Sequence, residues 1–372
     1  MMNPLNRVDW GSLARGPSVG ATLIRRRPAG SGSDVWQAVE FSYARFGEDL
    51  IVLHLLRDAP PRPLGDYAMP LNPGPPHVTV VIPTFNRSWG LRRAVGSVLA
   101  QTFLNFELII TDDASTDNTP EVARSFADPR IVYRRNLNNL GVPGNWGAGL
   151  RLARGEYVCF LMDDDYYDPD FLANRVAVMS SAADLVTVFS AYRRRPENGD
   201  AYQLFRPRGL FQGLLAQAEY FEAAICGNVF IGATMYRAAA LRPVWPQAEQ
   251  YEYVIDHALN LHLARRPGAT AYFLEKPDFT MACHAEQISE SRGDQVYEQA
   301  SDLLRDLLAA TTTPSERARI RHELSDWHLV WSRKARERQV YTVASQRLWA
   351  AIRVWPSNWG AWKQYARLVA GW

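Results

Sequence analysis

The sequence has few cysteines, and the three that it has are far apart. Cys159, Cys226 and Cys283 lie in apolar or strand-like surroundings, and their number is odd. A disulfide framework or a structural zinc site needs paired or closely spaced cysteines, so this pattern excludes both and favours reduced core residues. We therefore expect the protein to be cytoplasmic.

Segments that direct a chain to a membrane are also missing. The opening residues, "MMNPLNRVDWGSLARG", lack the basic-then-apolar pattern of a signal peptide, and no run reaches the ~18 apolar residues that a span needs. Basic and acidic residues are also nearly balanced, so the formal net charge is only +2 over 372 residues. That balance indicates no general attraction to nucleic acid, so we expect no nucleic-acid partner.

Glycine-rich phosphate loops are the third absence. Neither G-x-x-x-x-G-K-[ST] nor G-x-G-x-x-G follows a strand-like run. A bound nucleotide would need its phosphates held another way, and a divalent cation on carboxylates is the obvious substitute. The stretch "FLMDDDYYDP", residues 160–169, supplies three adjacent carboxylates. These repel one another unless a cation or a set of hydrogen-bond donors occupies the site.

The chain is long enough for a large core and for more than one domain, with 47% hydrophobic residues. Residues 58–76 are rich in proline and glycine and are predicted to be a linker. After them, strand-like and helix-like runs alternate, which is typical of a parallel sheet covered on both faces. The predicted strands are 77–83, 106–113, 130–135 and 157–162, and the predicted helices are 91–101, 119–126 and 142–155, the last closed by Gly155.

Polar sequences follow three of these strands: "PTFNR", "DDAST" and "DDD". Ligands of open parallel sheets bind beyond the carboxyl ends of the strands, so we expect these residues to share one site. Simple loop chemistry is the other interpretation, in which Asn86 braces a turn and Asp117 or Thr119 caps a helix. We prefer that interpretation for Asp117 and Thr119 only.

Three segments together resemble a known family. "VTVVIPTFNR", "SVLAQTFLNFELIITDDASTDNT" and "NLGVPGNWGAGLRLARGEYVCFLMDDDYYDPDFL" are similar to the inverting glycosyltransferases of family two. The resemblance extends over residues 78 to about 290 and implies a GT-A fold, which is α/β and Rossmann-like, with a mostly parallel sheet and helices on both faces. It implies non-processive transfer of a sugar from a UDP- or dTDP-sugar to a hydroxyl acceptor in bacterial surface glycan or glycoconjugate synthesis. The membrane helices and Q-x-x-R-W motif of processive synthases are absent.

The resemblance also implies which residues bind the donor nucleotide. Phe85 stacks on the base, Asp112 accepts a hydrogen bond from the base with Asp113 beside it, and Asp163 faces the ribose hydroxyls. The full implied set is Pro83, Thr84, Phe85, Asn86, Arg87, Asp112, Asp113, Asn139, Gly141 and Asp163.

The metal ligands implied by the family are Asp164, Asp165 and His284, holding Mn²⁺ or Mg²⁺ against the diphosphate. Two of them have alternatives: Asp165 as a solvated or helix-capping carboxylate, and His284 as a structural histidine. The sequence departs from the family at Met162, where many members have a further carboxylate. It departs again at Gly144, where many have an arginine.

Asp256, in "EYVIDHALNLHLAR", matches the family's general base, although Ile255 stands where an acidic partner is common. The alternative is a carboxylate that interacts with the dipole of a helix having Leu259 and Leu263 on its apolar stripe. In the implied mechanism Asp256 takes the proton of the acceptor hydroxyl, which attacks the anomeric carbon in line and inverts it. Residues 227–241 resemble the floor of the acceptor site.

The flanking regions complete the domain prediction: an N-terminal helical extension over 1–57, the linker 58–76, the GT-A domain 77–292 and a helical region 293–372. Ala344, Ala351, Pro356 and Trp362 have the spacing of a tetratricopeptide-like hairpin, which we expect to pack on the catalytic domain or on a second subunit.

The partner of the helical region is left open by the sequence. The basic run 333–338, beside Trp327 and Trp331, fits either an anionic membrane surface or a solvated face whose tryptophans belong to a helix interface; we favour the latter. Peripheral contact with the inner face of the membrane, a lipid-linked or other glycan acceptor and a homo-oligomer through these helices all stay open.

Two other functions remain as alternatives. One is a sugar nucleotidyltransferase, which would need a glycine-rich, arginine-bearing loop where this chain has "PTFNR". The other is a glycosyltransferase-like scaffold without turnover that acts through its C-terminal helices.

Overall fold

The computed structural model describes residues 75–196, 201–207, 209–284 and 292–369, together with the backbone of two short strands near the N-terminus. Its contacts divide the chain into two units, Met1–Leu71 and Asn72–Trp372. In the first unit β1 (Leu23–Arg26) and β2 (Trp36–Glu40) pair antiparallel. The helical prediction for 1–57 is wrong for these residues, and the rest of that extension and most of the linker 58–76 lie outside the described residues.

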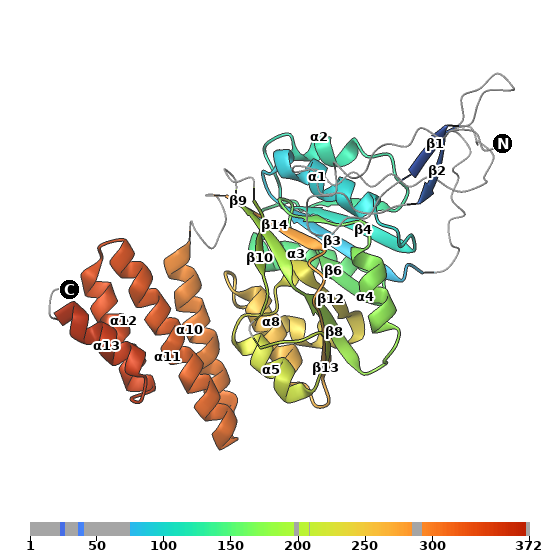
Figure 1. Ribbon diagram of the computed structural model, residues 1–372. Helices are drawn as coiled ribbons and strands as arrows, with labels where there is room; N and C mark the ends of the chain where they lie inside the picture. The colour runs from blue at the N-terminus through green and yellow to red at the C-terminus, as the bar shows by residue number, and fades with distance from the viewer. Residues whose placement is uncertain are drawn as a thin grey trace, which may run out of the picture. The chain divides into compact units, whose positions relative to one another are not determined.

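The second unit is built around an eight-stranded sheet with the order β11-β13-β8-β12-β6-β3-β4-β5 (Figure 1). The pairs β3–β4, β3–β6, β4–β5 and β8–β13 are parallel, whereas β12 and β11 pair antiparallel to their neighbours. The strands are β3 (Val78–Thr84), β4 (Phe106–Asp112), β5 (Ile131–Arg135), β6 (Tyr157–Phe160), β8 (Leu185–Ser190), β11 (Gly213–Leu215), β12 (Thr234–Arg237) and β13 (Thr270–Leu274).

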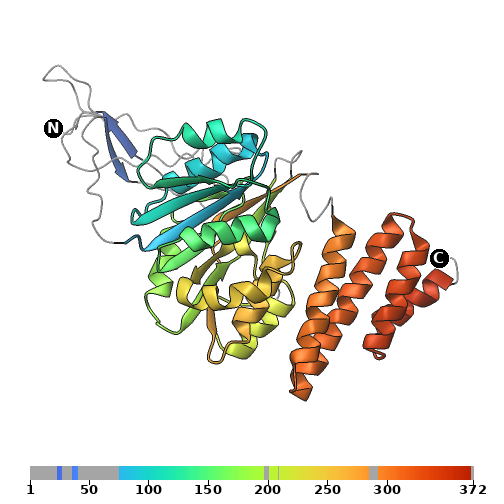
Figure 2. The same cartoon turned by 180° about the vertical axis from the view of Figure 1, so that it is seen from behind.

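Alternation along β3 places apolar side chains on both faces of this sheet. Val80 and Ile82 pack into one core with α1 (Ser88–Leu99), α2 (Thr119–Arg124) and α4 (Phe171–Met179). Val81 packs into the other core, which Figure 2 shows from the side covered by α3. The helices of this second face are α3 (Gly141–Leu152), α5 (Gln217–Ile225), α6 (Ala238–Leu241), α7 (Trp245–Ala248) and α8 (Ile255–Ala264).

The prediction that Gly155 closes α3 is wrong. The helix ends at Leu152, and Ala153 is its C-cap. Gly155 instead lies against β3, where a Cβ atom would stand 2.5 Å from the Thr79 nitrogen. Glycine is needed here because the backbone of the α3–β6 connection touches the backbone of β3.

A smaller sheet, with the order β10-β9-β14-β7, connects distant parts of the chain. Its central pair, β9 and β14, is parallel, and β14 also pairs antiparallel with β7, which directly follows the three aspartates. This pairing brings the end of β14 to the aspartates. The strands are β7 (Tyr166–Tyr167), β9 (Tyr192–Pro196), β10 (Gln203–Phe205) and β14 (Phe279–Cys283).

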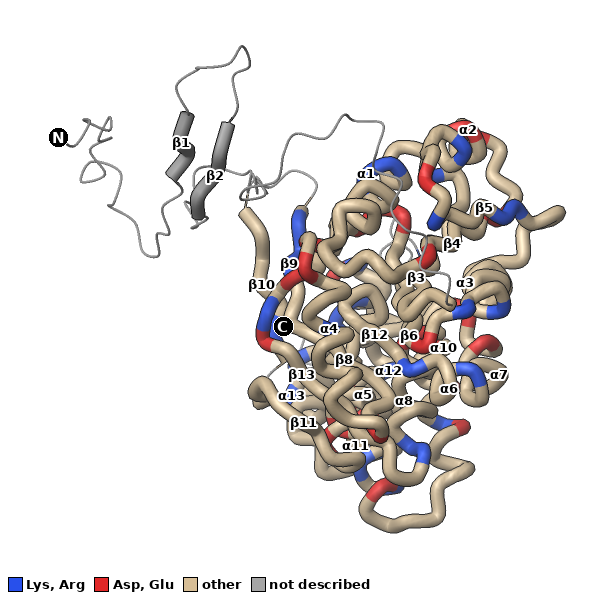
Figure 3. Tube along the Cα trace, turned by 90° about the vertical axis from the view of Figure 1, so that its right-hand side faces the viewer, with Lys and Arg blue, Asp and Glu red and all other residues tan. Residues whose placement is uncertain are grey.

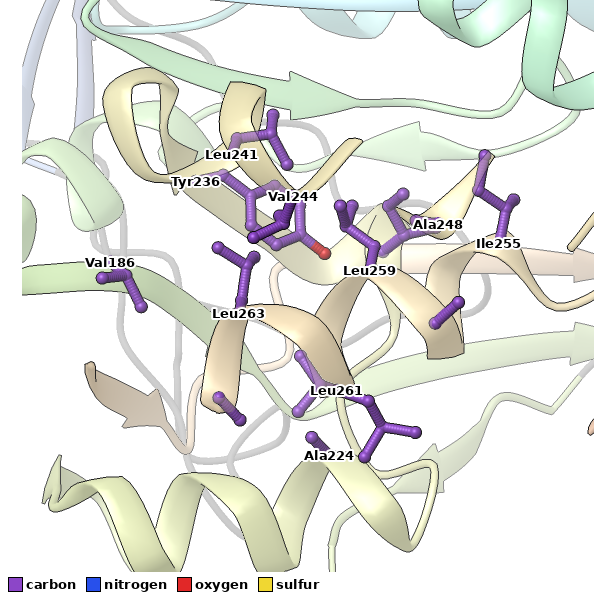
Figure 4. Close-up of a cluster of buried hydrophobic side chains, with 14 of the residues drawn as sticks. Val186, Ala224, Tyr236, Leu241, Val244, Ala248, Ile255, Leu259, Leu261 and Leu263 are labelled. Atoms are coloured by element: carbon purple, nitrogen blue, oxygen red, sulfur yellow. The ribbon is translucent and has the colours of Figure 1, made fainter. Parts of the chain in front are cut away.

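Helix α8 is buried on more sides than its sequence indicates. The predicted stripe of Leu259 and Leu263 is buried, but so is Leu261 on the other side of the helix. Figure 4 shows the three leucines between the Tyr236–Ala248 segment on one side and Ala224 of α5 on the other. The helix that carries Asp256 is therefore fixed from two sides.

Within residues 292–369 the helices are α10 (Gly293–Ala310), α11 (Pro314–Glu337), α12 (Tyr341–Val354) and α13 (Trp359–Val369). Figure 1 shows them side by side in chain order. Leu303, Leu304 and Leu324 belong to the same apolar core as α5 and α8, so the first two helices pack on the α/β domain. Trp331 is buried and stacks on Tyr297, as the helix-interface interpretation predicted.

The α/β architecture, with a mostly parallel sheet, helices on both faces and a helical C-terminal region, is confirmed. No helix in the described ranges is both long and apolar enough to cross a bilayer. Over the elements in view in Figure 3, basic and acidic residues are interspersed. The domain boundaries and the tetratricopeptide likeness of α12 and α13 stay predictions.

Candidate active site

A cavity of about 610 Å³ lies beyond the carboxyl ends of β3, β4 and β6. Residues from those three strand ends, from the first turn of α3 and from the segment before α8 line it together. The lining comprises Pro83, Thr84, Phe85, Arg87, Asp113, Asn139, Gly141, Val142, Asn145, Trp146, Met162, Asp163, Asp164, Asp165, Phe230, Glu252, Tyr253, Met281 and Arg292. The strand-end sequences singled out above thus converge on one cavity, as the parallel sheet requires.

Residues of the loop after β3 differ in whether they line the cavity or stabilise the loop. Phe85 lines the cavity and is half-exposed, so its ring is available for stacking. Asn86 does not line the cavity: it has φ 53°, and its Oδ1 accepts a hydrogen bond of 2.7 Å from the Thr116 N–H. The structure therefore gives Asn86 the turn-bracing role that was the alternative to nucleotide binding.

The two carboxylates that end β4 have different surroundings. Asp112 is fully buried, and its oxygens accept hydrogen bonds from the Tyr133 hydroxyl at 2.6 Å and the Ser115 N–H at 2.8 Å. Asp113 lines the cavity, with one oxygen held by the Leu140 N–H at 2.8 Å and by Asn136 at 2.9 Å. The geometry favours Asp113 rather than Asp112 as the carboxylate that meets a ligand.

The three aspartates after β6 are all buried, and all line the cavity. Burial, reinforced by the charge of Asp164, raises the pKa of Asp163 to about 7. The same two causes raise the pKa of Asp165 well above its usual range, although the Ala282 N–H donates to its Oδ1 at 2.9 Å. Asp165 is thus tied to β14 and is neither solvated nor at a helix cap.

Asp164 forms the centre of a charged cluster. Its Oδ2 lies 2.5 Å from Arg87 Nη1 and 2.7 Å from His284 Nε2. The side chains of all three are largely buried, and the rings of Trp89 and His284 meet edge to face, with 5.3 Å between their centroids. His284 does not line the cavity, but it lies beside Asp164, where the family resemblance placed it.

Helix α1 holds the aspartate loop from behind. Gly90, in its first turn, leaves no room for a side chain, because a Cβ atom would lie 2.5 Å from the Asp163 carbonyl oxygen. One turn on, the Arg93 guanidinium donates to the Asp164 carbonyl oxygen. The position of the carboxylates therefore depends on an element that is far from them in sequence.

The fit of this cluster to a divalent cation can be judged from its chemistry. Among the described residues no group of three His, Cys, Asp or Glu side chains is arranged to hold an ion by itself. Mg²⁺ and Mn²⁺ in nucleotide sites are commonly held by one or two carboxylates together with substrate phosphates. Burial and the charge of Asp164 raise the pKa values of Asp163 and Asp165, so a cation beside them would stabilise their charged forms. The residues fit a cation shared with a diphosphate.

Part of the cavity lining comes from the segment before α8 and from Arg292, just before α10. Glu252, Tyr253 and Arg292 line the cavity, and none of them was predicted as a site residue. Asp256 does not line it; its Oδ1 accepts from the His257 N–H at 2.8 Å, and burial raises its pKa. Asp256 as general base stays a prediction.

Of the predicted residues, Asn86, Asp112, Asp256 and His284 do not line the cavity. Among the residues that the prediction missed, Asn145 had a signal in the "GNW" motif. Its side-chain amide joins β3 and β4, donating to the Thr111 carbonyl at 3.0 Å. Arg292 had none, because it lies more than 120 residues along the chain from the aspartates.

Comparison with known proteins identifies the domain. Residues 79–243 match the model of Glycosyl transferase family 2. The chain contains a family 2 glycosyltransferase domain. The match includes the ends of β3, β4 and β6 and stops before α8 and the C-terminal helices.

Curated relatives resemble this domain over short stretches. One is the UDP-Glc:alpha-D-GlcNAc-diphosphoundecaprenol beta-1,3-glucosyltransferase WfaP of Escherichia coli, 34% identical over 104 residues, or 28% of this chain and 41% of WfaP. Another is the GalNAc(5)-diNAcBac-PP-undecaprenol beta-1,3-glucosyltransferase of Campylobacter jejuni, 43% identical over 93 residues, or 24% of this chain and 30% of that protein. The chain spans 22–41% of the length of the curated relatives that we compared.

Solved structures share the fold at low identity. Residues 1–349 of S. aureus TarS superpose with a TM-score of 0.55 at 18% identity, covering 74% of this chain and 82% of that one. The same TarS fragment in complex with UDP-GlcNAc gives a TM-score of 0.55 at 17% identity, with 74% and 81% covered. These likenesses confirm the GT-A fold of the glycosyltransferase domain.

Proposed function

We propose that this protein transfers a sugar from a nucleotide-sugar donor, UDP- or dTDP-linked, to a hydroxyl of a lipid-linked or other glycan acceptor. The observation that carries the proposal is the cavity itself. Within a family 2 glycosyltransferase domain it combines a half-exposed aromatic ring, Phe85, with Asp113 and the three aspartates, where a base, a ribose and a diphosphate need partners. The undecaprenol-linked acceptors named for two relatives support a lipid-linked acceptor in bacterial glycan synthesis.

The roles follow from position and charge. Phe85 stacks on the base, Asp113 accepts hydrogen bonds from the base, and Asp163 accepts them from the ribose hydroxyls. Arg87 lies 2.5 Å from Asp164 and offers its guanidinium to the diphosphate. Asp164, with His284 beside it, is the residue that would hold Mn²⁺ or Mg²⁺; a bound cation would offset the charge on the leaving diphosphate.

The chemical step is a single displacement. Asp256, at the start of α8, removes the proton of the acceptor hydroxyl, and the oxygen attacks the anomeric carbon from the side opposite the diphosphate. The carbon is inverted because no enzyme carboxylate forms a bond to it, in contrast to retaining glycoside hydrolases. A raised pKa makes the Asp256 carboxylate a stronger base than an exposed aspartate.

A calorimetric titration tests the proposal. The protein is titrated with UDP, dTDP, GDP and CDP, each with Mn²⁺ and again with EDTA. We expect one nucleotide to bind, more tightly with the metal. Asp163→Asn should weaken that binding about tenfold or more, since it removes a charged acceptor. Asp170→Asn, a half-exposed carboxylate that does not line the cavity, is the matched control.

The absence of nucleotide binding would contradict the proposed function. If the folded protein binds none of the four nucleotides, the proposal is wrong and the scaffold alternative replaces it. The family match already argues against a sugar nucleotidyltransferase.

A further inference from the structure

The last two helices expose several large aromatic side chains. Trp359 is 82% exposed, and Trp349 and Trp362 are each 39% exposed. Tryptophan is normally well buried, and exposed apolar groups that gather on one surface usually mark a contact. None of these residues lines the cavity that forms the candidate active site.

These side chains form one continuous surface across α12 and α13. The Trp349 ring meets Tyr365 at 4.8 Å and Trp362 at 6.3 Å, measured between centroids. Trp359 and Trp362 are three residues apart in α13, so they lie on the same side of that helix. We call Trp349, Trp359, Trp362 and Tyr365 the tryptophan face.

Basic side chains of α12 and α13 border the tryptophan face, and one carboxylate, Asp326 of α11, lies beside it, 3.0 Å from Asn358 Nδ2. Arg353 follows Trp349 by four residues, and Lys363 follows Trp359 by four, so each cation lies one helical turn from an aromatic ring. Both are exposed, as is Arg367, and none of the three pairs with an acidic side chain in the part of the chain that the structure describes. From Arg338 to Trp372 the sequence contains no aspartate or glutamate.

The basic run 333–338 is a weaker candidate for the same kind of contact. Trp331 is buried, with Arg347 over its ring. Lys334 pairs with Glu337 at 3.2 Å, and Arg338 pairs with Asp294 at 3.4 Å. Its aromatic side chains belong to the helix interface, so they are not available to a partner.

We propose that the tryptophan face docks on the surface of an anionic phospholipid bilayer. Tryptophan rings favour the headgroup level of a membrane, and cations next to them are attracted to anionic lipids. The charged residues that α12 and α13 contribute around the face are all basic, which fits a partner whose surface is uniformly negative better than a protein of mixed charge. Binding of this kind is peripheral and needs no membrane-spanning helix. The inference does not depend on the proposed sugar transfer.

Vesicle sedimentation tests the proposal. The full chain is mixed either with vesicles of pure phosphatidylcholine or with vesicles in which about 30% of the lipid is phosphatidylglycerol. The bound fraction of protein is measured at low and at high salt. We expect binding to the anionic vesicles only, weakened by salt. Trp359→Ala should weaken it severalfold, and each of Arg353→Gln and Lys363→Gln by about fivefold.

Matched controls are available in the catalytic domain. Phe211→Ala removes an aromatic residue that is 74% exposed, and Arg92→Gln removes an exposed cation of α1; both should bind vesicles like the unmodified protein.

Three outcomes would overturn the proposal. They are no binding to anionic vesicles, equal binding by the Trp359→Ala variant, and equal weakening by the control variants. Light scattering gives a fourth outcome. If the protein does not bind vesicles but forms a dimer that the Trp359→Ala substitution abolishes, the tryptophan face contacts a second copy of the chain. Because nucleotide titration measures the other site, failure here leaves the proposed transfer untouched.

Discussion

Neighbouring carboxylates in this domain have different surroundings, although they are adjacent in sequence. Asp112 is enclosed by Tyr133 and Ser115, while Asp113 lines the cavity. The same holds after β6, where Asp165 is tied to β14 and Asp164 meets Arg87 and His284. At the end of β4 this difference follows from strand alternation, because successive side chains point to opposite sides; after β6 it follows from the partners that each aspartate meets.

The two carboxylates that end β4 should therefore respond differently to substitution. Asp113→Asn is expected to weaken binding of the nucleotide identified by calorimetry about tenfold. Asp112→Asn should lower the free energy of unfolding by about 1–3 kcal/mol, since Ser115 and the half-buried Tyr133 lose a charged acceptor, and should leave nucleotide binding nearly unchanged. Calorimetry and urea unfolding measure the two effects. A larger loss of nucleotide binding in Asp112→Asn would restore the assignment made from the sequence.

The general base can be tested against a second carboxylate, Glu252, which lies four residues earlier in the chain. Asp256→Asn should lower kcat by about 100-fold or more while donor binding is kept, because only proton removal is lost. Glu252→Gln, which changes a residue lining the cavity, should raise KM for the acceptor and affect kcat less. The measurement is the initial rate of nucleoside diphosphate release. The reverse order of the two kcat effects would make Glu252 the base.

At the scale of elements, helix α1 supports the aspartate loop through a close contact that leaves no room for a side chain at Gly90. Gly90→Ala should lower stability by about 1–3 kcal/mol and weaken donor binding, since the new methyl group meets the Asp163 carbonyl oxygen. Gly96→Ala, in the same helix with no neighbour within 4 Å, should raise stability by about 0.5–1 kcal/mol. Thermal unfolding and nucleotide titration of both variants compare them. Equal effects would show that the α1 contact is unimportant.

The contact between α8 and α11 predicts a pH dependence of stability. His257 stacks on Trp327, and burial lowers its pKa to about 4. The unfolded chain, with a pKa near 6.5, therefore binds more protons than the folded chain between pH 6.5 and 4, so stability falls on acidification. This residue should contribute a loss of about 2 kcal/mol on going from pH 7 to pH 5.

Replacement of the histidine isolates that contribution. His257→Phe keeps a ring against Trp327 but cannot be protonated, so its stability should fall less between pH 7 and pH 5 in urea unfolding. His262 and His328 also have lowered pKa values and remain in both proteins, so only the difference between the two curves is assigned to His257. Parallel curves would contradict the prediction.

At the scale of the whole molecule, the C-terminal helices are part of the catalytic unit. Gln299 of α10 accepts a hydrogen bond of 2.7 Å from the Tyr253 N–H, and Asp306 accepts one of 2.6 Å from the Tyr251 hydroxyl. These contacts fix the segment that carries Glu252 and leads into Asp256. Leucines of α10 and α11 also close the core around α8.

A chain that ends after Arg292 should therefore be unstable, because it exposes the apolar surface that α10 and α11 cover. We expect it to aggregate or to melt well below the full chain. Gln299→Ala is the milder test: it should raise KM for the acceptor while nucleotide binding is kept. Acceptor kinetics and calorimetry check this. A truncated chain as stable and active as the full one would show that the helices are an independent module.

The sequence by itself determined the alternation of strands and helices and the set of strand ends that carry the site. These features are local: the period of apolar residues fixes the type of each element, and parallel strands bring their carboxyl ends to one edge. Ten of the predicted site residues line the cavity for this reason, although their roles stay predictions.

Only the tertiary structure decided which side chain of each strand end faces the cavity. In the folded chain Asn86 braces a turn, Asp113 but not Asp112 lines the cavity, His284 and Arg87 lie at Asp164, and Arg292 joins the cavity lining. Each of these outcomes depends on partners tens to hundreds of residues away in the chain. Contacts of that kind are set by packing between elements, so no local pattern of residues could specify them.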